Sequence, residues 1–447
     1  MPHRLGCLLI CLLLTAEALA GPRSPLLAEP LSCPAVPYLV ICPEKAVGVV
    51  EPLVRLHQQS ALPGRIVSAE AIYKWAGQAS PSAIASFLRH LPRSQMKFVL
   101  LVGCADAKAE LFLPATMTPA RYVHPTLACD EYFYSDLPYA QPAEGAAPDL
   151  AVGRLPARSV GELRGMVALA AAAMKAEPGP WQRKVELVAG RAEVNPALDA
   201  LLDVSLQRLI DRRSSEKLEL HLLSGRQTDQ VQSADPRPLF LQRLNAAPAM
   251  LIYVGHGRPD ALGRLSNQSG QTPILTSADC VQLALPCPRT LVLAIACQTG
   301  DFVRAGSLCE AMLACKAGPG AFIGASGISQ PYGNAVLANV LSDVLADAPA
   351  TAGELLLELR SRLWTCTDSG LTLLDLPASA LLGGQTALQA QIRDTAVMYN
   401  LLGDPAMPLG CKREAASPAD RPARSTADSV APRAGAPSKP RALGGFD

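Results

Sequence analysis

Short apolar runs alternate along this chain with amphipathic stretches. The runs at 38–42, 97–103 and 250–254 are apolar, contain β-branched residues and end near small or turn-forming residues, which is typical of buried strands. The stretches at 81–90 and 160–175 carry apolar residues at helical spacing. This alternation predicts an α/β fold, with mostly parallel sheets flanked by helices on both faces.

The same pattern extends over the rest of the chain. It predicts further strands at 65–68, 150–152, 185–189, 218–223, 290–297 and 321–325. It predicts further helices at 45–57, 196–211, 238–245, 307–314, 334–345, 353–364 and 386–396. A Pro- and Gly-rich break at 177–180 predicts a boundary between two side-by-side subdomains, an N-terminal one at 37–180 and a second one at 181–411.

The two ends of the chain differ in composition from this core. Arg4 gives a short basic start, residues 5–14 are apolar, and Ala18-Leu-Ala20 fits a cleavage site, so we predict a signal peptide at 1–20. The apolar run is short for a membrane span, and no other segment has transmembrane character. We therefore expect an exported protein, periplasmic or extracellular, with no integral membrane segment after signal removal.

Two further segments have too few apolar residues to form a core. Residues 21–36 are rich in proline and predict an extended lead-in. Residues 412–447 are rich in Pro, Ala, Ser and Arg with almost no large apolar residue. Such a composition cannot bury enough apolar surface to fold, so we predict a disordered tail.

The net charge and the spacing of residues that could bind a metal narrow the range of possible functions. The formal net charge is +1, which gives no support for nucleic acid or an anionic membrane surface as a partner. No CxxC pair occurs and the six histidines are scattered, so we expect no metal site and no cofactor.

The cysteine count suggests a free thiol. Of thirteen cysteines, two lie in the predicted signal peptide, so an odd number, eleven, remains. In an exported protein, an odd number leaves at least one thiol unpaired or in an intermolecular bridge. One free nucleophile with up to five disulfides fits this count. Pairs close in sequence are candidates for disulfides: Cys280 with Cys287, and Cys309 with Cys315.

Two strands end at residues that can do chemistry together. The apolar run 250–254 leads to His256 and Gly257, and the run at 290–296 leads to Cys297. Neighbouring parallel strands would place both side chains at the carboxyl edge of the sheet, where open α/β sheets form their sites. A thiol beside a histidine forms a nucleophile with its proton partner. The amides of Gly257 and Cys297 lie beside small residues and could form an oxyanion hole.

Each of these residues also has a simpler interpretation. Taken alone, Cys297 fits a buried half-cystine and His256 fits a hydrogen-bonded core histidine. Together, each after an apolar strand and close to a glycine, they favour a cysteine peptidase. A serine hydrolase of the α/β type is disfavoured because the chain has no G-x-S-x-G motif.

Five motifs then resemble the gingipain family of cysteine peptidases (peptidase family C25), within the caspase-like clan. Tyr253-Val-Gly-His-Gly257 resembles the family's histidine block, and Ala296-Cys-Gln-Thr-Gly-Asp-Phe302 its nucleophile block. Three further segments, at 148–158, 320–326 and 399–406, agree in order and spacing. The resemblance covers about residues 36–411. It implies a caspase-like three-layer sandwich and a peptide or protein substrate.

The resemblance also implies roles for single residues. Cys297 would be the nucleophile and His256 the general acid/base. An acidic residue that orients the histidine in the family matches Glu193, although a solvated surface glutamate is an equal interpretation.

Several residues are candidates for the pocket that binds the substrate residue before the cleaved bond. The resemblance places Gln330 and Tyr332 along the wall, and an ordinary half-buried aromatic is an even alternative for Tyr332. Asp199 and Asp130 are candidate acids for a basic substrate side chain, because a buried cation needs a partner. Asp130 fits a turn cap equally well, and no preference for basic residues follows.

Two functions of different class remain. The first is an exported cysteine endopeptidase that works through a Cys–His dyad and an acyl-enzyme. The alternative is a caspase-like binding or scaffold protein that kept the dyad and lost turnover, which the weak matches for the orienting acid and the pocket acid motivate.

Overall fold

The computed structural model describes residues 24–124, 127–177, 184–190, 219–224, 237–263, 273–366 and 372–409, together with 179 and 182. All of them belong to one compact unit, residues 1–412. The predicted signal peptide at 1–20, the helix at 196–211 and the tail at 412–447 lie outside the described residues. Most of the predicted lead-in is described, and it includes a short 3-10 helix, Pro30–Ser32.

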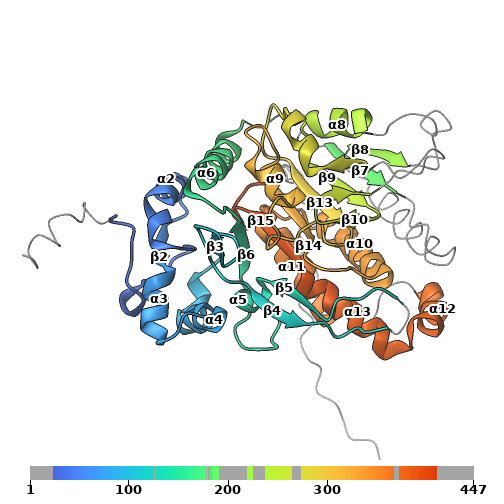
Figure 1. The fold of residues 1–447 in the computed structure, drawn as a ribbon, viewed down its shortest axis with the longest axis horizontal. Coiled ribbons are helices and arrows are strands. Elements are labelled where there is room, and N and C mark those ends of the chain that lie inside the picture. The colour runs from blue at the N-terminus through green and yellow to red at the C-terminus, as the bar shows by residue number, and fades with distance from the viewer. Residues whose placement is uncertain are drawn as a thin grey trace, which may run out of the picture. The chain divides into compact units, whose positions relative to one another are not determined.

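A ten-stranded sheet forms the centre of the molecule, with strand order β2-β1-β3-β6-β15-β14-β13-β9-β7-β8 (Figure 1). Among neighbours with several register pairs, only β14 and β15 are antiparallel; the rest are parallel. The strands are β1 (Tyr38–Cys42), β2 (Gly64–Ser68), β3 (Phe98–Val102), β6 (Ala151–Leu155), β7 (Lys184–Ala189), β8 (Glu219–Ser224), β9 (Met250–Val254), β13 (Leu291–Ile295), β14 (Ala321–Ala325) and β15 (Tyr399–Gly403). The predicted α/β class with a mostly parallel sheet is confirmed.

The strands are apolar along their whole length because helices cover both faces of the sheet. Every residue of β1, β3, β9 and β13 is buried. Strands buried on both sides need no polar face, so they appear as continuous apolar runs and not as alternating ones.

Two helical layers bury two apolar cores against the sheet. One core contains residues of α3 (Ala69–Ala76), α4 (Pro81–His90), α5 (Leu137–Ala140), α10 (Pro331–Ala346), α11 (Ala352–Thr365), α12 (Thr372–Leu382) and α13 (Gln385–Met398). The other contains residues of α2 (Val47–Gln59), α6 (Val160–Lys175), α8 (Arg237–Asn245) and α9 (Leu308–Ala314). The result is a helix–sheet–helix sandwich.

Polar residues mark several helix starts. Ser68, Ser80, Ser159 and Thr351 each accept a hydrogen bond from the amide three residues on, at the N-termini of α3, α4, α6 and α11. Such caps satisfy an amide that has no partner within the helix.

Smaller elements complete the described fold. β4 (Thr116–Pro119) and β5 (Tyr132–Ser135) form an antiparallel hairpin. Next to β9, a three-stranded sheet contains β10 (Gly257–Arg258), β11 (Ala261–Leu262) and β12 (Leu275–Thr276). Three further 3-10 helices cover Glu44–Ala46, Arg93–Gln95 and Ser277–Gln282.

The pairing between β6 and β15 is the shortest in the sheet. These strands share one register pair, Arg154 with Leu402, whereas the other neighbours in the sheet share four to six. The two strands come from opposite sides of the boundary predicted near residue 180. One sheet nevertheless continues through both parts, and the division into subdomains stays a prediction.

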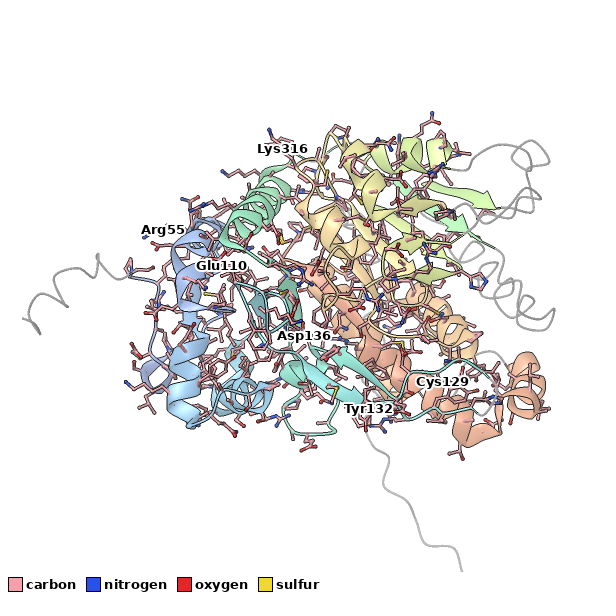
Figure 2. The ribbon with its side chains drawn as sticks, viewed as in Figure 1. Arg55, Glu110, Cys129, Tyr132, Asp136 and Lys316 are labelled. Atoms are coloured by element: carbon pink, nitrogen blue, oxygen red, sulfur yellow. The ribbon has the colours of Figure 1, made fainter. Side chains whose placement is uncertain are left out.

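Arg154 and Arg158 each pair with an acidic side chain. Arg154 is fully buried and pairs with Asp136 through two hydrogen bonds of 2.7 and 2.8 Å. It also donates to the carbonyls of Gly103 and Leu113. Arg158 pairs with Glu310 at 3.1 Å. Figure 2 labels Asp136, which follows the β4–β5 hairpin.

The disulfide candidates are wrong. In the part of the chain that the structure describes, none of the ten cysteines forms a disulfide bond. Cys309 instead contacts the Ser307 hydroxyl, and the thiol of Cys315 faces a backbone carbonyl. A separation of six positions near the end of a helix turns the two side chains to different sides. Cys280 and Cys287 are likewise unpaired.

No helix among the described residues is both long and apolar enough to cross a membrane.

Candidate active site

Strand pairing brings His256 and Cys297 to the same edge of the sheet. β9 and β13 are adjacent and parallel, with Val254 opposite Ile295 at their carboxyl ends. His256 and Cys297 each lie two residues beyond this pair. The predicted juxtaposition of the two strand ends is therefore present, at the edge where parallel α/β sheets form their sites.

Gly257 packs directly on the backbone of Cys297. A β-carbon built on Gly257 would lie 2.5 Å from the Cys297 carbonyl oxygen and 2.9 Å from Cβ of Ala296. Ordinary van der Waals contacts begin near 3.4 Å. A side chain at this position would therefore force the histidine segment away from the cysteine segment, and only glycine permits the observed approach.

The loop after β9 fixes the backbone of His256. The carbonyl of His256 accepts hydrogen bonds from the Tyr253 hydroxyl at 2.8 Å and from the Gly263 amide at 2.7 Å. The side chain of Tyr253 is fully buried, so this contact ties the loop to the core. The His256 residue itself is exposed, which leaves the imidazole accessible from solvent.

A sharp turn follows Cys297. Gln298 has φ 56°, in the left-handed region that costs a non-glycine residue roughly 1–2 kcal/mol. Two hydrogen bonds hold the turn, from the Gln298 amide to the Gly327 carbonyl at 2.9 Å and from the Gly300 amide to the Ala325 carbonyl at 2.8 Å. Gly300 also lies so close to the backbone of Gly324 that a β-carbon would clash. This contact explains the glycine of the Cys-x-x-Gly segment.

The Cys297 thiol is surrounded by the segment after β14. Its sulfur lies 3.4 Å from the Ser329 carbonyl, to which it donates, and 3.6 Å from the Ser329 hydroxyl. Burial raises the pKa of the Cys297 thiol, hydrogen bonds from Ser329 lower it, and the nearby carboxylate of Asp130 raises it further. Deprotonation of this thiol therefore needs a partner that stabilises the thiolate and offsets the effect of burial on the pKa.

The loop between β4 and β5 holds this segment from the other side. A carboxylate oxygen of Asp130 accepts from the Ile328 amide at 2.5 Å. The Gln330 amide group donates to the Ala128 carbonyl at 3.0 Å and contacts the Cys129 sulfur at 3.7 Å. Figure 2 shows Cys129 in this loop, on the side of the molecule where α12 and α13 lie. The contacts of Asp130 and Gln330 thus fasten residues 326–330 to the β4–β5 loop, and we call these contacts the clamp.

Of the remaining predicted site residues, one is buried in the core and two lie outside the described residues. Tyr332 is 2% exposed, and its hydroxyl donates to a carboxylate oxygen of Asp375 at 2.9 Å, so the aromatic ring is part of the core. Glu193 and Asp199 lie outside the described residues. Their roles stay predictions, as do the pocket roles of Gln330, Tyr332 and Asp130.

Sequence reasoning missed the residues behind the thiol. Ser329, Asn334 and Tyr399 are all buried and form a continuous hydrogen-bonded chain that reaches the sulfur of Cys297. Tyr399 begins a segment compared with the gingipain family, and Ser329 directly precedes Gln330, but no local pattern indicates that they meet.

A cavity of about 750 Å³ lies elsewhere in the molecule. It lies between α4, the β4–β5 hairpin and α11, and its walls include Arg89, Arg121 and Trp364 but neither Cys297 nor His256. Among the residues that the structure describes, no group of three or more His, Cys, Asp or Glu side chains could hold a metal ion.

Comparison with known proteins agrees with this geometry. The sequence matches peptidase family C25 over residues 33–410. No curated protein matches the chain.

Solved structures share the fold. The Arg-specific cysteine proteinase gingipain R is 15% identical, with a TM-score of 0.56, over 86% of this chain and 80% of that one. The complex of pro- and mature domains of RgpB from Porphyromonas gingivalis is 16% identical, with a TM-score of 0.56, over 83% of this chain and 79% of that one. A structure described only as a protease is 15% identical, with a TM-score of 0.59, over 85% and 79%.

The family match covers most of the chain, and it agrees with the sheet that brings a cysteine and a histidine together. The chain belongs to peptidase family C25 and is a cysteine peptidase of the gingipain type.

Proposed function

We propose that this protein is an exported endopeptidase that cleaves peptide bonds with Cys297 as nucleophile and His256 as general acid/base. The observation that carries the proposal is the packing of the Gly257 backbone against Cys297, at the carboxyl ends of two adjacent parallel strands. Family membership supports the reaction class.

The proposed reaction has two steps. In the first, the thiolate of Cys297 attacks the carbonyl carbon of the peptide bond, the carbon–nitrogen bond breaks, and His256 gives a proton to the leaving amine. In the second, His256 takes a proton from water, the resulting hydroxide attacks the thioester, and the carbon–sulfur bond breaks to release the acid product and the thiolate. The exposed His256 can exchange protons with solvent between the steps.

The amides of Gly257 and Cys297 are the proposed donors to the oxyanion. Close packing of these two residues supports this role, because two amide groups must converge on one oxygen at hydrogen-bonding distance. The strained turn at Gln298 also supports it, since residues held in unfavourable φ/ψ regions cluster at functional sites.

Substrate binding is proposed for the clamp around residues 326–330. Asp130 and Gln330 belong to this clamp and lie beside the segment that contacts the nucleophile. Tyr332 and Asp199 are further candidates for the pocket, and Glu193 is the candidate that orients His256. The proposal of export rests on the signal-like pattern of residues 1–20.

Labelling of the protein with peptide electrophiles tests the proposal. We would react it with acyloxymethyl-ketone peptides that carry Arg, Lys, Asp, Asn or Leu next to the reactive group, and map the adduct by mass spectrometry. The expected result is one adduct, on Cys297, that is lost in Cys297→Ala and strongly reduced in His256→Ala. The best probe then identifies the preferred substrate side chain.

Cys315→Ala is the matched control, because it removes another free thiol. It should leave the adduct unchanged. An adduct on a different cysteine, or hydrolysis of peptides that persists in Cys297→Ala, would refute the assignment of the nucleophile. A folded protein that no probe labels would favour the binding or scaffold function.

A further inference from the structure

Ser329 makes both of the hydrogen bonds that are described between the Cys297 sulfur and another residue. The sulfur donates to the Ser329 carbonyl at 3.4 Å, and the Ser329 hydroxyl donates to the sulfur at 3.6 Å. Ser329 lies in the segment that joins β14 to α10. The thiol is therefore held on the side of β14, while the histidine segment approaches it from β9.

A chain of hydrogen bonds continues from Ser329 into the core. The Asn334 side-chain amide donates to the Ser329 hydroxyl oxygen at 2.8 Å. The Tyr399 hydroxyl donates to the Asn334 side-chain oxygen at 2.7 Å. These residues come from α10 and from the start of β15, and all three side chains are buried.

The chain has a direction. An amide nitrogen can only donate, so the Ser329 oxygen is an acceptor towards Asn334, and its own proton is left for another partner. Tyr399 fixes the orientation of the Asn334 amide by donating to its oxygen. Burial raises the pKa of the Tyr399 hydroxyl well above its ordinary value, so it stays protonated and remains a donor. The free proton of Ser329 can thus point at sulfur.

We propose that Tyr399, Asn334 and Ser329 form a positioning relay that directs the Ser329 hydroxyl at the Cys297 sulfur, fixes its rotamer and stabilises the thiolate. The inference rests on the proposed role of Cys297 as nucleophile and adds three residues to its machinery. They are positioning residues, because none of them needs to contact the substrate.

The relay acts where the fold otherwise opposes ionisation. The thiol is surrounded by protein, and the carboxylate of Asp130 lies on the neighbouring segment. A preorganised donor stabilises a buried anion without reorganisation, and charge-assisted hydrogen bonds of this kind are roughly twice as strong as neutral ones. The direction of the chain strengthens the last donor, because successive hydrogen bonds polarise one another.

The pH dependence of Cys297 alkylation tests the relay. Iodoacetamide reacts with the thiolate, and mass spectrometry of the Cys297 peptide separates it from the other thiols. In Ser329→Ala we expect the midpoint of the profile to rise by about one pH unit, which lowers the rate near neutral pH about tenfold. Ser329→Thr keeps the hydroxyl and should restore the parental midpoint.

Asn334→Leu tests the donor to Ser329. It is nearly isosteric and adds no charge, but it removes both the amide that donates to Ser329 and the oxygen that accepts from Tyr399. The midpoint should again rise. Ser342→Ala is the matched control: Ser342 is fully buried on the same helix, and its hydroxyl has no partner among the described residues. Its midpoint should not move.

A purely structural role predicts a different result. It would lower the unfolding temperature of Ser329→Ala or Asn334→Leu without moving the alkylation midpoint, and that outcome would overturn the relay. If Ser329→Ala does not fold, Tyr399→Phe provides the test, with an expected shift in the same direction. Alkylation needs no turnover, so a moved midpoint in a protein that cleaves no peptide would refute the proposed function and leave the relay standing.

Discussion

Replacing Gly257 with alanine tests the geometry of the site directly. The added β-carbon would lie 2.5 Å from the Cys297 carbonyl oxygen and 2.5 Å from the Thr299 methyl group. Gly257 does not have a left-handed φ, so alanine can adopt its backbone conformation. The substitution also keeps the amide N–H. The effect of Gly257→Ala is therefore a displacement, without backbone strain or a lost donor.

The size of the effect follows from the overlap. Ordinary contacts begin near 3.4 Å, so the two segments must separate by roughly an ångström. Overpacking of this kind costs about 1–3 kcal/mol of stability. Since Gly257 follows His256 and packs on Cys297, the shift also separates the proposed dyad, and a misplacement of about 1 Å at a catalytic group can cost on the order of 100-fold in rate.

Two measurements separate these effects. Urea unfolding gives the loss of stability, and the rate of adduct formation at Cys297 with the best peptide probe gives the loss of reactivity. Gly165→Ala is the control, since an added β-carbon on this helical residue meets nothing within 4 Å. Alanine is favoured over glycine in helices by about 1 kcal/mol, so this variant should be slightly more stable and equally reactive. Parental stability and reactivity in Gly257→Ala would refute the close approach.

Two further predictions concern buried charges. Arg154→Met leaves Asp136 buried without its partner, so urea unfolding should show a loss of about 3–5 kcal/mol. A comparable change at the more exposed Arg93 should cost about 1 kcal/mol or less, and equal losses would contradict the prediction. Burial raises the pKa of Glu310 from 4.5 to about 7, although Arg158 opposes the shift. Between about pH 4.5 and 7 the folded state keeps a proton that the unfolded chain releases, so stability falls as the pH rises through this range. Glu310→Gln should flatten this dependence, and an unchanged slope would contradict it.

The sequence predicts the central strands of the sheet well because each of them can be recognised from its own residues. Strands buried on both faces are apolar throughout, so the runs at β1, β3, β9 and β14 can be recognised one by one. The pairing of β9 with β13 then follows from parallel topology, which also places His256 and Cys297 together. No local property of either residue would have been sufficient.

β15 shows why other parts could not be predicted. This strand is central and fully buried, yet the sequence pattern does not predict it. Asn400 lies within it and interrupts the apolar pattern. Its side chain accepts hydrogen bonds from the Asp136 amide and from Arg360, both distant in sequence. A polar residue whose partners are supplied only by tertiary structure has no local signature of burial.

The disulfide candidates failed for a related reason. Proximity in sequence does not bring two thiols together, because the direction of the side chains decides whether a bridge can form. Cys309 and Cys315 each face other partners. The sequence pattern does not predict the hairpin of β4 and β5 either, and its loop brings Asp130 and Cys129 to the site through contacts that only the folded chain makes.

The surroundings of the proposed nucleophile therefore come from segments that the sequence separates widely. The hairpin loop holds residues 326–330 through Asp130 and Gln330, and this segment in turn holds the Cys297 sulfur through Ser329. A change in the hairpin loop that moves this segment must also move the groups that orient the thiol. If the clamp binds substrate as proposed, occupancy of the pocket and alignment of the sulfur are mechanically coupled. Binding energy from a substrate side chain could then be used to orient the nucleophile, which is how remote contacts come to accelerate a chemical step.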